Sequence, residues 1–238
     1  MMDVIKAYAV NNLCYIAAQK MIPKGIVVHT TGANNPYLKR YVDAPDEVGT
    51  NRYGNHWNQE KPGGRKVCVH AFIGYDKDEN IRVAELLPLD ICCWGVGNGT
   101  NGSYNFDPAY IQFEICEDKL LDRDYYEKVF LVAVEYCAEL CHTYNISVEN
   151  VVGHNEAYRL GYGSNHCDPE HWMRNFGESM SDFRAKVSEK LNDDAKKGKT
   201  VAKKSTSLFS KQKKQSSEGM LPSGLRNKKW YKFLVMKN

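Results

Sequence analysis

The stretch Gly25-Ile26-Val27-Val28-His29-Thr30-Thr31-Gly32 decides the fold predicted for this chain. Its apolar run, residues 26–28, predicts a buried strand, because short runs of branched apolar residues next to a glycine are typical of core strands. His29 ends this run, so we expect its side chain at the edge of the sheet. The run Val151-Val152-Gly153-His154 repeats the pattern late in the chain and predicts a second core strand that ends in a histidine.

A third candidate ligand, Asp168, lies in the segment Ser164-Asn165-His166-Cys167-Asp168-Pro169. Two imidazoles and a carboxylate leave the fourth position of a tetrahedral zinc ion open for water, which is the arrangement of a catalytic site. The residues therefore predict a zinc hydrolase with His29, His154 and Asp168 as metal ligands. His166 precedes Asp168 by two residues, so in an extended segment both side chains point the same way and His166 lies beside the metal.

Glu114 is the candidate general base. It lies in a predicted strand, Tyr110–Cys116, in which apolar residues alternate with Gln112 and Glu114. Taken alone, this pattern also fits a glutamate that is exposed on the surface of a strand. If its face of the sheet forms the cleft, Glu114 is placed to accept a proton from a metal-activated water.

Length and composition indicate one folded domain, alone or with an appendage. Of the 238 residues, 42% are hydrophobic and 11% are aromatic, which is enough for a packed core. No apolar run of about 18 residues is present, so we expect no membrane span. The first residues lack the pattern of a secretory signal. The eight cysteines include no CxxC pair, and we expect most of them to be reduced core residues rather than parts of disulfides or of a four-cysteine zinc site.

The net charge of +3 is unevenly distributed along the chain. Residues 196–238 contain 13 Lys and Arg and one acid, Glu218, whereas residues 1–195 contain 19 Lys and Arg and 28 Asp and Glu. Residues 196–214 are rich in Lys, Ser and Gly, and we expect a solvated linker there. The basic tail is interpreted either as solvated chain or as an electrostatic attachment to an anionic polymer.

Periodic patterns predict the remaining elements. Residues 4–20 are expected to contain a short helix. Residues 67–75 and 81–87 are expected to form a hairpin, because a polar turn separates two apolar strands. Apolar residues recur at helical spacing over residues 124–144, which predicts the clearest helix, and a closing amphipathic helix is expected at residues 179–191.

These motifs together resemble the zinc N-acetylmuramoyl-L-alanine amidases of the type 2 amidase/peptidoglycan-recognition superfamily. The resemblance rests on the two strands that end in histidine and on the segment Ser164–Trp172. Further matching motifs are His56-Trp57-Asn58-Gln59, Pro62-Gly63-Gly64-Arg65, Val69-His70-Ala71-Phe72-Ile73-Gly74 and Phe113-Glu114-Ile115-Cys116-Glu117-Asp118. The resemblance covers roughly residues 4–190 and is strongest to clostridial phage and prophage endolysins.

The resemblance implies an α/β fold, with a central mixed β-sheet of about five to six strands flanked by helices. It implies hydrolysis of the amide bond between N-acetylmuramic acid and L-alanine in bacterial peptidoglycan. His29, His154 and Asp168 would hold Zn²⁺, and Glu114 would take the proton of the attacking water. His166 would stabilise the oxyanion, at a position where many relatives have lysine or histidine.

Two departures from the family pattern bear on this assignment. Some relatives use cysteine as the third ligand, and Cys167 is adjacent to Asp168. We favour Asp168, because it directly precedes Pro169 and keeps the family's two-residue spacing from His166. Relatives commonly have histidine after the tryptophan of Cys93-Trp94-Gly95, so Gly95 predicts altered substrate contacts rather than loss of zinc.

The domain prediction is a zinc amidase domain over residues 1–195 and a basic linker or tail over residues 196–238. This tail could also be the remnant of a wall-binding element, with anionic wall polymers as its expected partner. The favoured function is that of a phage endolysin or bacterial autolysin. The alternatives are a peptidoglycan-binding protein without turnover and a nucleic-acid-associated protein, which the acidic body disfavours. The absent signal and the resemblance together predict accumulation in a host bacterial cytoplasm before release to the cell wall.

Overall fold

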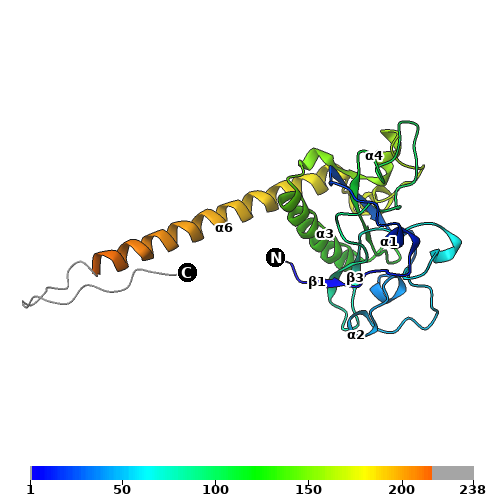
Figure 1. Ribbon diagram of the computed structural model, residues 1–238, viewed down its shortest axis with the longest axis horizontal. Helices are drawn as coiled ribbons and strands as arrows, with labels where there is room; N and C mark the ends of the chain where they lie inside the picture. The colour runs from blue at the N-terminus through cyan, green and yellow to red at the C-terminus, as the bar shows by residue number, and fades with distance from the viewer. Residues whose placement is uncertain (1, 216–238) are drawn as a thin grey trace, which may run out of the picture. The chain divides into compact units, whose positions relative to one another are not determined.

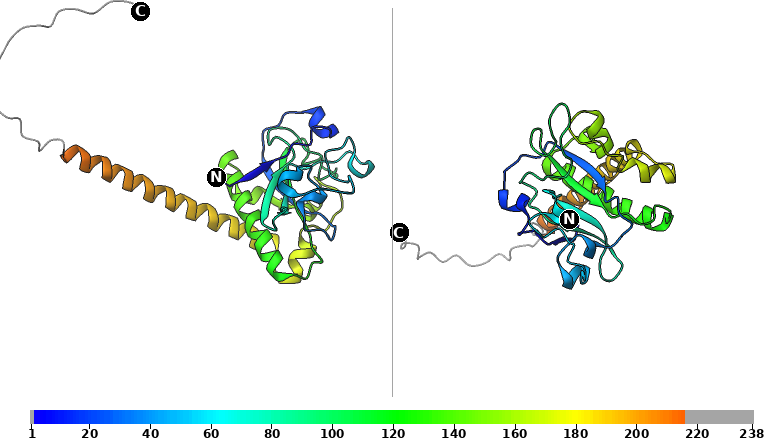
Figure 2. Two further views of the ribbon diagram at one scale, coloured as in Figure 1. Left: turned by 90° about the horizontal axis from the view of Figure 1, so that it is seen from below. Right: turned by 90° about the vertical axis from the view of Figure 1, so that its right-hand side faces the viewer.

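The computed structural model describes residues 2–215, and for residues 2–197 it also describes the side chains. One mixed sheet of six strands forms its centre, in the order β1-β4-β3-β5-β2-β6 (Figures 1 and 2). The strands are β1 (Val4–Lys6), β2 (Gly25–Thr30), β3 (Ala71–Tyr75), β4 (Ile81–Glu85), β5 (Tyr110–Ile115) and β6 (Val151–Gly153). Strands β3 and β4 pair antiparallel, and the other four pairs are parallel. The predicted α/β fold with a mixed sheet flanked by helices is therefore confirmed.

Helices flank this sheet (Figure 2). They are α1 (Leu13–Ala17), α2 (Pro45–Val48), α3 (Arg123–Tyr144), α4 (His154–Arg159), α5 (Glu170–Met173) and α6 (Met180–Gln215), with short 3₁₀ turns at Leu38–Arg40, Pro62–Gly64, Val148–Asn150 and Arg174–Phe176. The predicted helix over residues 124–144 is confirmed as α3. It begins where the carboxylate of Asp122 accepts a hydrogen bond from the Tyr125 amide at 3.1 Å, and it ends at Asn145 in the left-handed conformation.

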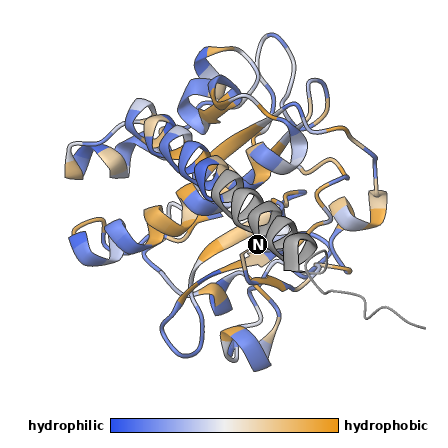
Figure 3. Cartoon of the chain, turned by 90° about the vertical axis from the view of Figure 1, so that its left-hand side faces the viewer, coloured by the Kyte–Doolittle hydropathy of each residue, from blue (hydrophilic) through white to orange (hydrophobic). Residues whose placement is uncertain are grey.

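The two faces of the sheet have different environments. Ile26, Val28 and Phe113 belong to the core beneath α3, which contacts β3, β4 and β5. The residue that follows each of these in its strand points to the opposite face, because side chains alternate in a β-strand. His29 and Glu114 therefore lie on the face away from α3. Figure 3 shows mostly hydrophobic colouring on the strands, as expected for a sheet covered on both faces.

The strand order places the candidate ligands at one edge of the sheet. Strand β2 lies between β5 and β6 and runs parallel to both, so the carboxyl ends of all three strands meet. His29 is paired in register with Glu114, and Val28 is paired with Gly153. His154 follows Gly153 directly and begins α4. In open α/β sheets, ligands bind at this edge.

The sequence prediction was wrong at three places. Residues 4–20 contain a strand at the sheet edge, β1, as well as a short helix, and residues 67–70 precede β3 instead of belonging to it. No helix was predicted at residues 196–214, where α6 continues to Gln215. The segment is rich in lysine, which favours helix, and it contains one glycine and no proline.

The chain divides into two compact units, and the first comprises Met1–Asp194. Side chains beyond residue 197 and the backbone beyond residue 215 lie outside the described residues, and so does most of the expected basic tail. Within the part that is described, no helix has the length and apolar character needed to cross a bilayer.

Candidate metal centre

The structure brings His29, His154 and Asp168 together. One donor atom from each residue lies within 4.8 Å of the donor atoms of the other two. Nδ1 of His29 is 3.3 Å from Oδ2 of Asp168, and Nδ1 of His154 is 3.4 Å from Oδ1 of the same carboxylate. All three residues are buried. They form the one cluster of potential metal ligands of this size among the residues whose side chains are described.

The spacing of these donor atoms fits a tetrahedral zinc ion. Zinc–ligand bonds of about 2.0–2.1 Å place tetrahedral donor atoms roughly 3.3 Å apart, close to the distance between each Nδ1 atom and its nearer oxygen of Asp168. Nδ1 of His154 is buried and has no hydrogen-bond partner in the described part of the chain. A buried polar atom without a partner is costly in a folded protein. A cation between the three side chains would remove that cost.

Each imidazole keeps its other nitrogen in a hydrogen bond. Nε2 of His29 lies 3.2 Å from Oε1 of Gln112, and Nε2 of His154 lies 3.0 Å from the backbone oxygen of Val96. Metal-binding histidines commonly donate their second ring N–H to such oxygens, which leaves the lone pair of the first nitrogen for the metal. The two Nδ1 atoms that face Asp168 are therefore the available donors.

Asp168 is the dominant charge of the cluster. Burial opposes ionisation of its carboxyl group, but polar contacts with the three neighbouring histidines outweigh burial and hold the pKa of Asp168 well below its usual range. Burial also lowers the pKa of His29, yet its contact with Asp168 and the charge of Glu114 reverse this, and the net shift is upward. For His154 burial prevails and lowers the pKa. An ionised carboxylate and neutral imidazoles are the protonation states that bind zinc.

Glu114 lies beside His29 at the end of the neighbouring strand. Burial raises the pKa of its carboxyl group from 4.5 to about 7, and the positive charge of His29 offsets part of that shift. Oε2 of Glu114 is buried and makes no hydrogen bond to any described residue. A carboxylate with an available oxygen and a pKa near neutrality is suited to accept a proton from water.

His166 lies on the solvent side of the cluster. Its Nδ1 is 3.5 Å from Oδ1 of Asp168, and its ring centroid is 4.3 Å from that of His154. The side chain remains 56% exposed, so it can reach a substrate that approaches from solvent. The predicted proximity of His166 and Asp168 is therefore present in the structure.

Cys167 is not part of the cluster that His29, His154 and Asp168 form. Its side chain is exposed, whereas Asp168 is 7% exposed and contacts both imidazoles. All eight cysteines are free thiols, and the other seven are buried. The expectation that most of the cysteines are reduced core residues is thus confirmed.

His70 has a structural role. It is fully buried, its Nδ1 accepts a hydrogen bond from the Gln112 amide at 3.0 Å, and its Nε2 donates to the Ile91 carbonyl at 2.9 Å. Burial lowers its pKa to about 4, so the ring is neutral at pH 7. The His70 side chain therefore connects the backbone of β5 to that of Ile91, and it lies outside the metal cluster.

Sequence reasoning did not identify Gln112 as part of the site. Its side chain is fully buried although the residue is polar, and it contacts His29. The alternation of residues 110–116 placed Gln112 and Glu114 on one face of the strand. A polar pair on a face that carries a candidate ligand was the one signal available in the sequence.

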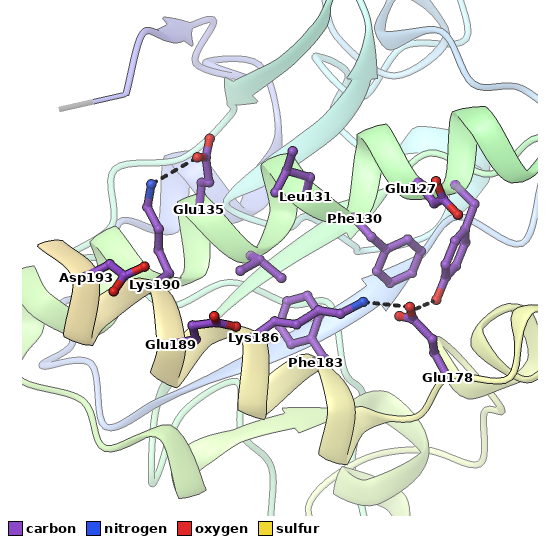
Figure 4. A pocket seen from close by; sticks show the side chains of 12 residues that line it. Glu127, Phe130, Leu131, Glu135, Glu178, Phe183, Lys186, Glu189, Lys190 and Asp193 are labelled. Atoms are coloured by element: carbon purple, nitrogen blue, oxygen red, sulfur yellow. Dashed lines mark hydrogen bonds and ion pairs between the residues drawn. The ribbon is translucent and has the colours of Figure 1, made fainter.

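A separate groove of about 370 Å³ lies between α3 and the first turns of α6 (Figure 4). Phe130 and Phe183 line it, and ion pairs between Lys186 and Glu178 and between Lys190 and Glu135 lie along its sides. None of the candidate metal or catalytic residues lines this groove. It is therefore distinct from the centre at the carboxyl ends of the strands.

Comparison with known proteins gives the family context of this centre. The family model described as N-acetylmuramoyl-L-alanine amidase matches residues 19–171, which include every candidate site residue. No curated protein matches the sequence at a comparable level.

Solved structures of similar fold cover most of the chain. The Staphylococcus aureus hydrolase AmiA, solved in complex with its ligand, is 22% identical, with a TM-score of 0.56 over 79% of this chain and 83% of that chain. A mutant endolysin from Bacillus subtilis is 24% identical, with a TM-score of 0.51 over 79% and 99%. The PlyG catalytic domain is 25% identical, with a TM-score of 0.54 over 80% and 96%. These similarities agree with the observed fold, and the expected likeness to clostridial enzymes stays a prediction.

Proposed function

Because the chain belongs to the N-acetylmuramoyl-L-alanine amidase family, we propose that His29, His154 and Asp168 bind one zinc ion at its active centre. The enzyme hydrolyses the amide bond between N-acetylmuramic acid and L-alanine in peptidoglycan. The single observation that supports the zinc assignment best is that both Nδ1 atoms converge on one carboxylate, His29 at 3.3 Å from Oδ2 and His154 at 3.4 Å from Oδ1 of Asp168. The resemblance to endolysins supports a lytic role, with synthesis in a bacterial cytoplasm before release to the wall.

Zinc at this position would polarise the scissile carbonyl and make a water molecule acidic enough to attack it at neutral pH. Glu114 accepts the proton of that water, since its buried oxygen Oε2 is available and its pKa is raised. The same carboxyl group then returns the proton to the nitrogen of L-alanine as the amide bond breaks. His166 donates a hydrogen bond to the oxygen on which negative charge develops.

Product analysis tests this function. Purified full-length protein should release new amino groups of L-alanine from cell walls without new reducing sugar ends, and a zinc chelator should stop the release. Mass spectrometry of the products would identify the bond that is cut. Binding to walls without any release of L-alanine amino groups would favour the alternative of a peptidoglycan-binding protein and would contradict the enzymatic proposal.

Replacing His166 with alanine is expected to lower kcat by about 100- to 1,000-fold, the usual effect of removing one oxyanion donor. Zinc affinity should stay within a factor of about three, because His166 is not among the three proposed ligands. The matched control is His142→Ala, an exposed histidine near the end of α3. Steady-state kinetics on a soluble muramyl peptide checks this prediction, and equal kcat values for the two variants would remove His166 from the mechanism.

We also propose that the basic residues 196–238 attach the enzyme to anionic wall polymers. The support is their composition, 13 Lys and Arg against one acid, beside an acidic catalytic unit. Deleting these residues should abolish the salt-sensitive part of wall adsorption while soluble muramyl peptides are cleaved at the normal rate. Unchanged adsorption at low salt would contradict this role.

A further inference from the structure

One loop and one strand, neither of which bears a proposed metal ligand, meet at the outer nitrogens of both metal-site imidazoles. Val96 and Asn105 come from the loop between β4 and β5, and Gln112 comes from β5 itself. The backbone oxygen of Val96 accepts the Nε2 hydrogen of His154 at 3.0 Å, and it also accepts a hydrogen bond from the Ser164 hydroxyl at 3.0 Å. A carbonyl oxygen can only accept, so this contact requires the hydrogen of His154 to be on Nε2.

The backbone N–H of Val96 begins a second series of hydrogen bonds, which leads to His29. The backbone N–H of Val96 can only donate, and it donates to Oδ1 of Asn105 at 3.2 Å. This contact fixes which end of the Asn105 amide is oxygen. Nε2 of Gln112 then donates to the same Oδ1 at 2.9 Å and approaches the Tyr104 carbonyl at 3.5 Å.

The orientation of Gln112 follows from these contacts. Because its nitrogen faces two acceptors, its oxygen Oε1 must face Nε2 of His29, 3.2 Å away. An oxygen at that position requires the hydrogen of His29 to be on Nε2, which leaves the Nδ1 lone pair directed at Asp168. Each step in this chain of contacts has one permitted donor and one permitted acceptor.

Gly95 leaves the space that Gln112 occupies. A Cβ atom at position 95 would lie 2.5 Å from Oε1 of Gln112 and 2.7 Å from Cγ1 of Val69. Both distances are shorter than a carbon atom can tolerate without movement of its neighbours. The glycine after Trp94 is therefore coupled to the buried amide, although the two residues are far apart in the sequence.

We propose that Gln112 is a positioning residue for the zinc site, which the Val96 backbone orients through Asn105 so that His29 presents Nδ1 to the metal. His154 is oriented by the same backbone residue directly. Gly95 is required because it leaves room for the amide of Gln112. This inference rests on the proposed zinc site, and it assigns the lone-pair direction of both imidazoles to one short loop.

Zinc affinity and hydrogen exchange test the proposal on the full-length protein. Gln112→Ala should weaken zinc binding by about 10- to 100-fold, the usual effect of removing a group that orients a ligand. Competition with a chromophoric chelator measures this affinity. In the zinc-loaded protein, the ring N–H of His29 should exchange with solvent at least about tenfold faster than in the wild type. The ring N–H of His154 should keep its rate and serves as an internal reference in the same NMR spectrum.

Two further variants separate positioning from general damage to the fold. Asn12→Ala removes a buried amide that bonds to Trp57 and Val67, outside this network, and it should lower thermal stability without changing zinc affinity. Gly95→Ala should weaken zinc binding in the wild type but add little to the loss of zinc affinity in the Gln112→Ala background, because the displaced amide is then absent. The close contact with Val69 remains in both backgrounds and should lower thermal stability in both. Gly95→Ala also tests the proposal if Gln112→Ala does not fold.

The same measurements distinguish failure of the positioning proposal from failure of the zinc-site proposal. If the wild-type protein binds no zinc, the site itself is wrong. If the wild type binds zinc and a folded Gln112→Ala variant binds it within a factor of about three, with the His29 ring N–H still protected, the positioning role is wrong. Additive effects of Gly95→Ala and Gln112→Ala would overturn the proposed coupling between these two residues.

Discussion

Glu114→Gln is expected to lower the turnover of muramyl peptides by about 100- to 10,000-fold, the usual contribution of a positioned general base. Glutamine has nearly the shape of glutamate but cannot accept the proton of the attacking water. Zinc should still bind, because Glu114 is paired with His29 on the neighbouring strand but is not among the three clustered donors. The loss should therefore be in kcat, with zinc stoichiometry unchanged.

The pH dependence of the wild-type enzyme should report the same group. Burial raises the pKa of Glu114 to about 7, and a bound divalent cation would lower it from there. The basic form is lost as pH falls, so kcat/KM should decline on the acid side with an apparent pKa at or below about 7. Steady-state kinetics of the wild type and Glu114→Gln at several pH values measures both effects. Wild-type turnover in the glutamine variant would reassign the base.

The metal-free protein offers a check that does not depend on catalysis. The pKa of Glu114 is about 7 in the folded state, against an ordinary value of 4.5. Between these values the folded protein binds more protons than the unfolded protein, so Glu114 makes stability fall as pH rises through this window. Glu114→Gln should flatten that decline in thermal melts of the metal-free protein. If stability depended on pH in the same way in Glu114→Gln and in the wild type, the pKa of Glu114 would not be raised, and its carboxyl group would be in contact with water.

Asp168→Ala is expected to weaken zinc binding by about 100- to 1,000-fold, the share of one ligand in the affinity of a typical protein zinc site. Activity at low zinc concentration should be lost in parallel. The carboxylate contacts both Nδ1 atoms, so its removal also leaves the two buried imidazoles without their counter-charge. Zinc titration followed by activity assay measures the two quantities on one sample.

Cys167→Ala is the matched control for Asp168→Ala. The thiol is adjacent in sequence but exposed, and Asp168 lies in the cluster with both histidines. Zinc affinity and turnover should match the wild type within a factor of about two, because an exposed side chain without a ligand role contributes little. If Cys167→Ala lost zinc and Asp168→Ala retained it, the third ligand would be the cysteine.

The strands that hold the site could be predicted because their apolar runs are short, branched and followed by a polar residue. Strands β2 and β6 are examples, because every residue in them is buried. Helix α3 could be predicted for a different reason, since its buried residues recur at helical spacing. The sequence could not give the order of the strands, since the edge position of β1 beside β4 depends on contacts between distant segments. The continuation of α6 beyond residue 195 was missed because lysine-rich composition was weighed more heavily than helix propensity.

The sequence was sufficient to predict some residues of the candidate site but not the contacts of others. His29 and His154 end core strands, and Asp168 belongs to a motif, so local sequence was sufficient to propose them. The contact of Gln112 with His29 was not predictable, because it depends on a loop, residues 96–105, that has no periodic pattern. The consequence of Gly95 also needed the structure, since Gly95 lies in a loop and the nearest atom that a Cβ would meet belongs to Gln112 in strand β5.

X-ray absorption spectroscopy of the zinc-loaded full-length protein tests the central claim most directly. The account predicts one zinc ion per chain, surrounded by nitrogen and oxygen atoms alone at about 2.0–2.1 Å. The pattern of outer-shell scattering should show two imidazole rings. A sulfur atom at about 2.3 Å from the zinc would show that a cysteine, instead of Asp168, is a ligand. Failure to bind zinc at all, or coordination by one imidazole, would contradict the proposed convergence of His29, His154 and Asp168.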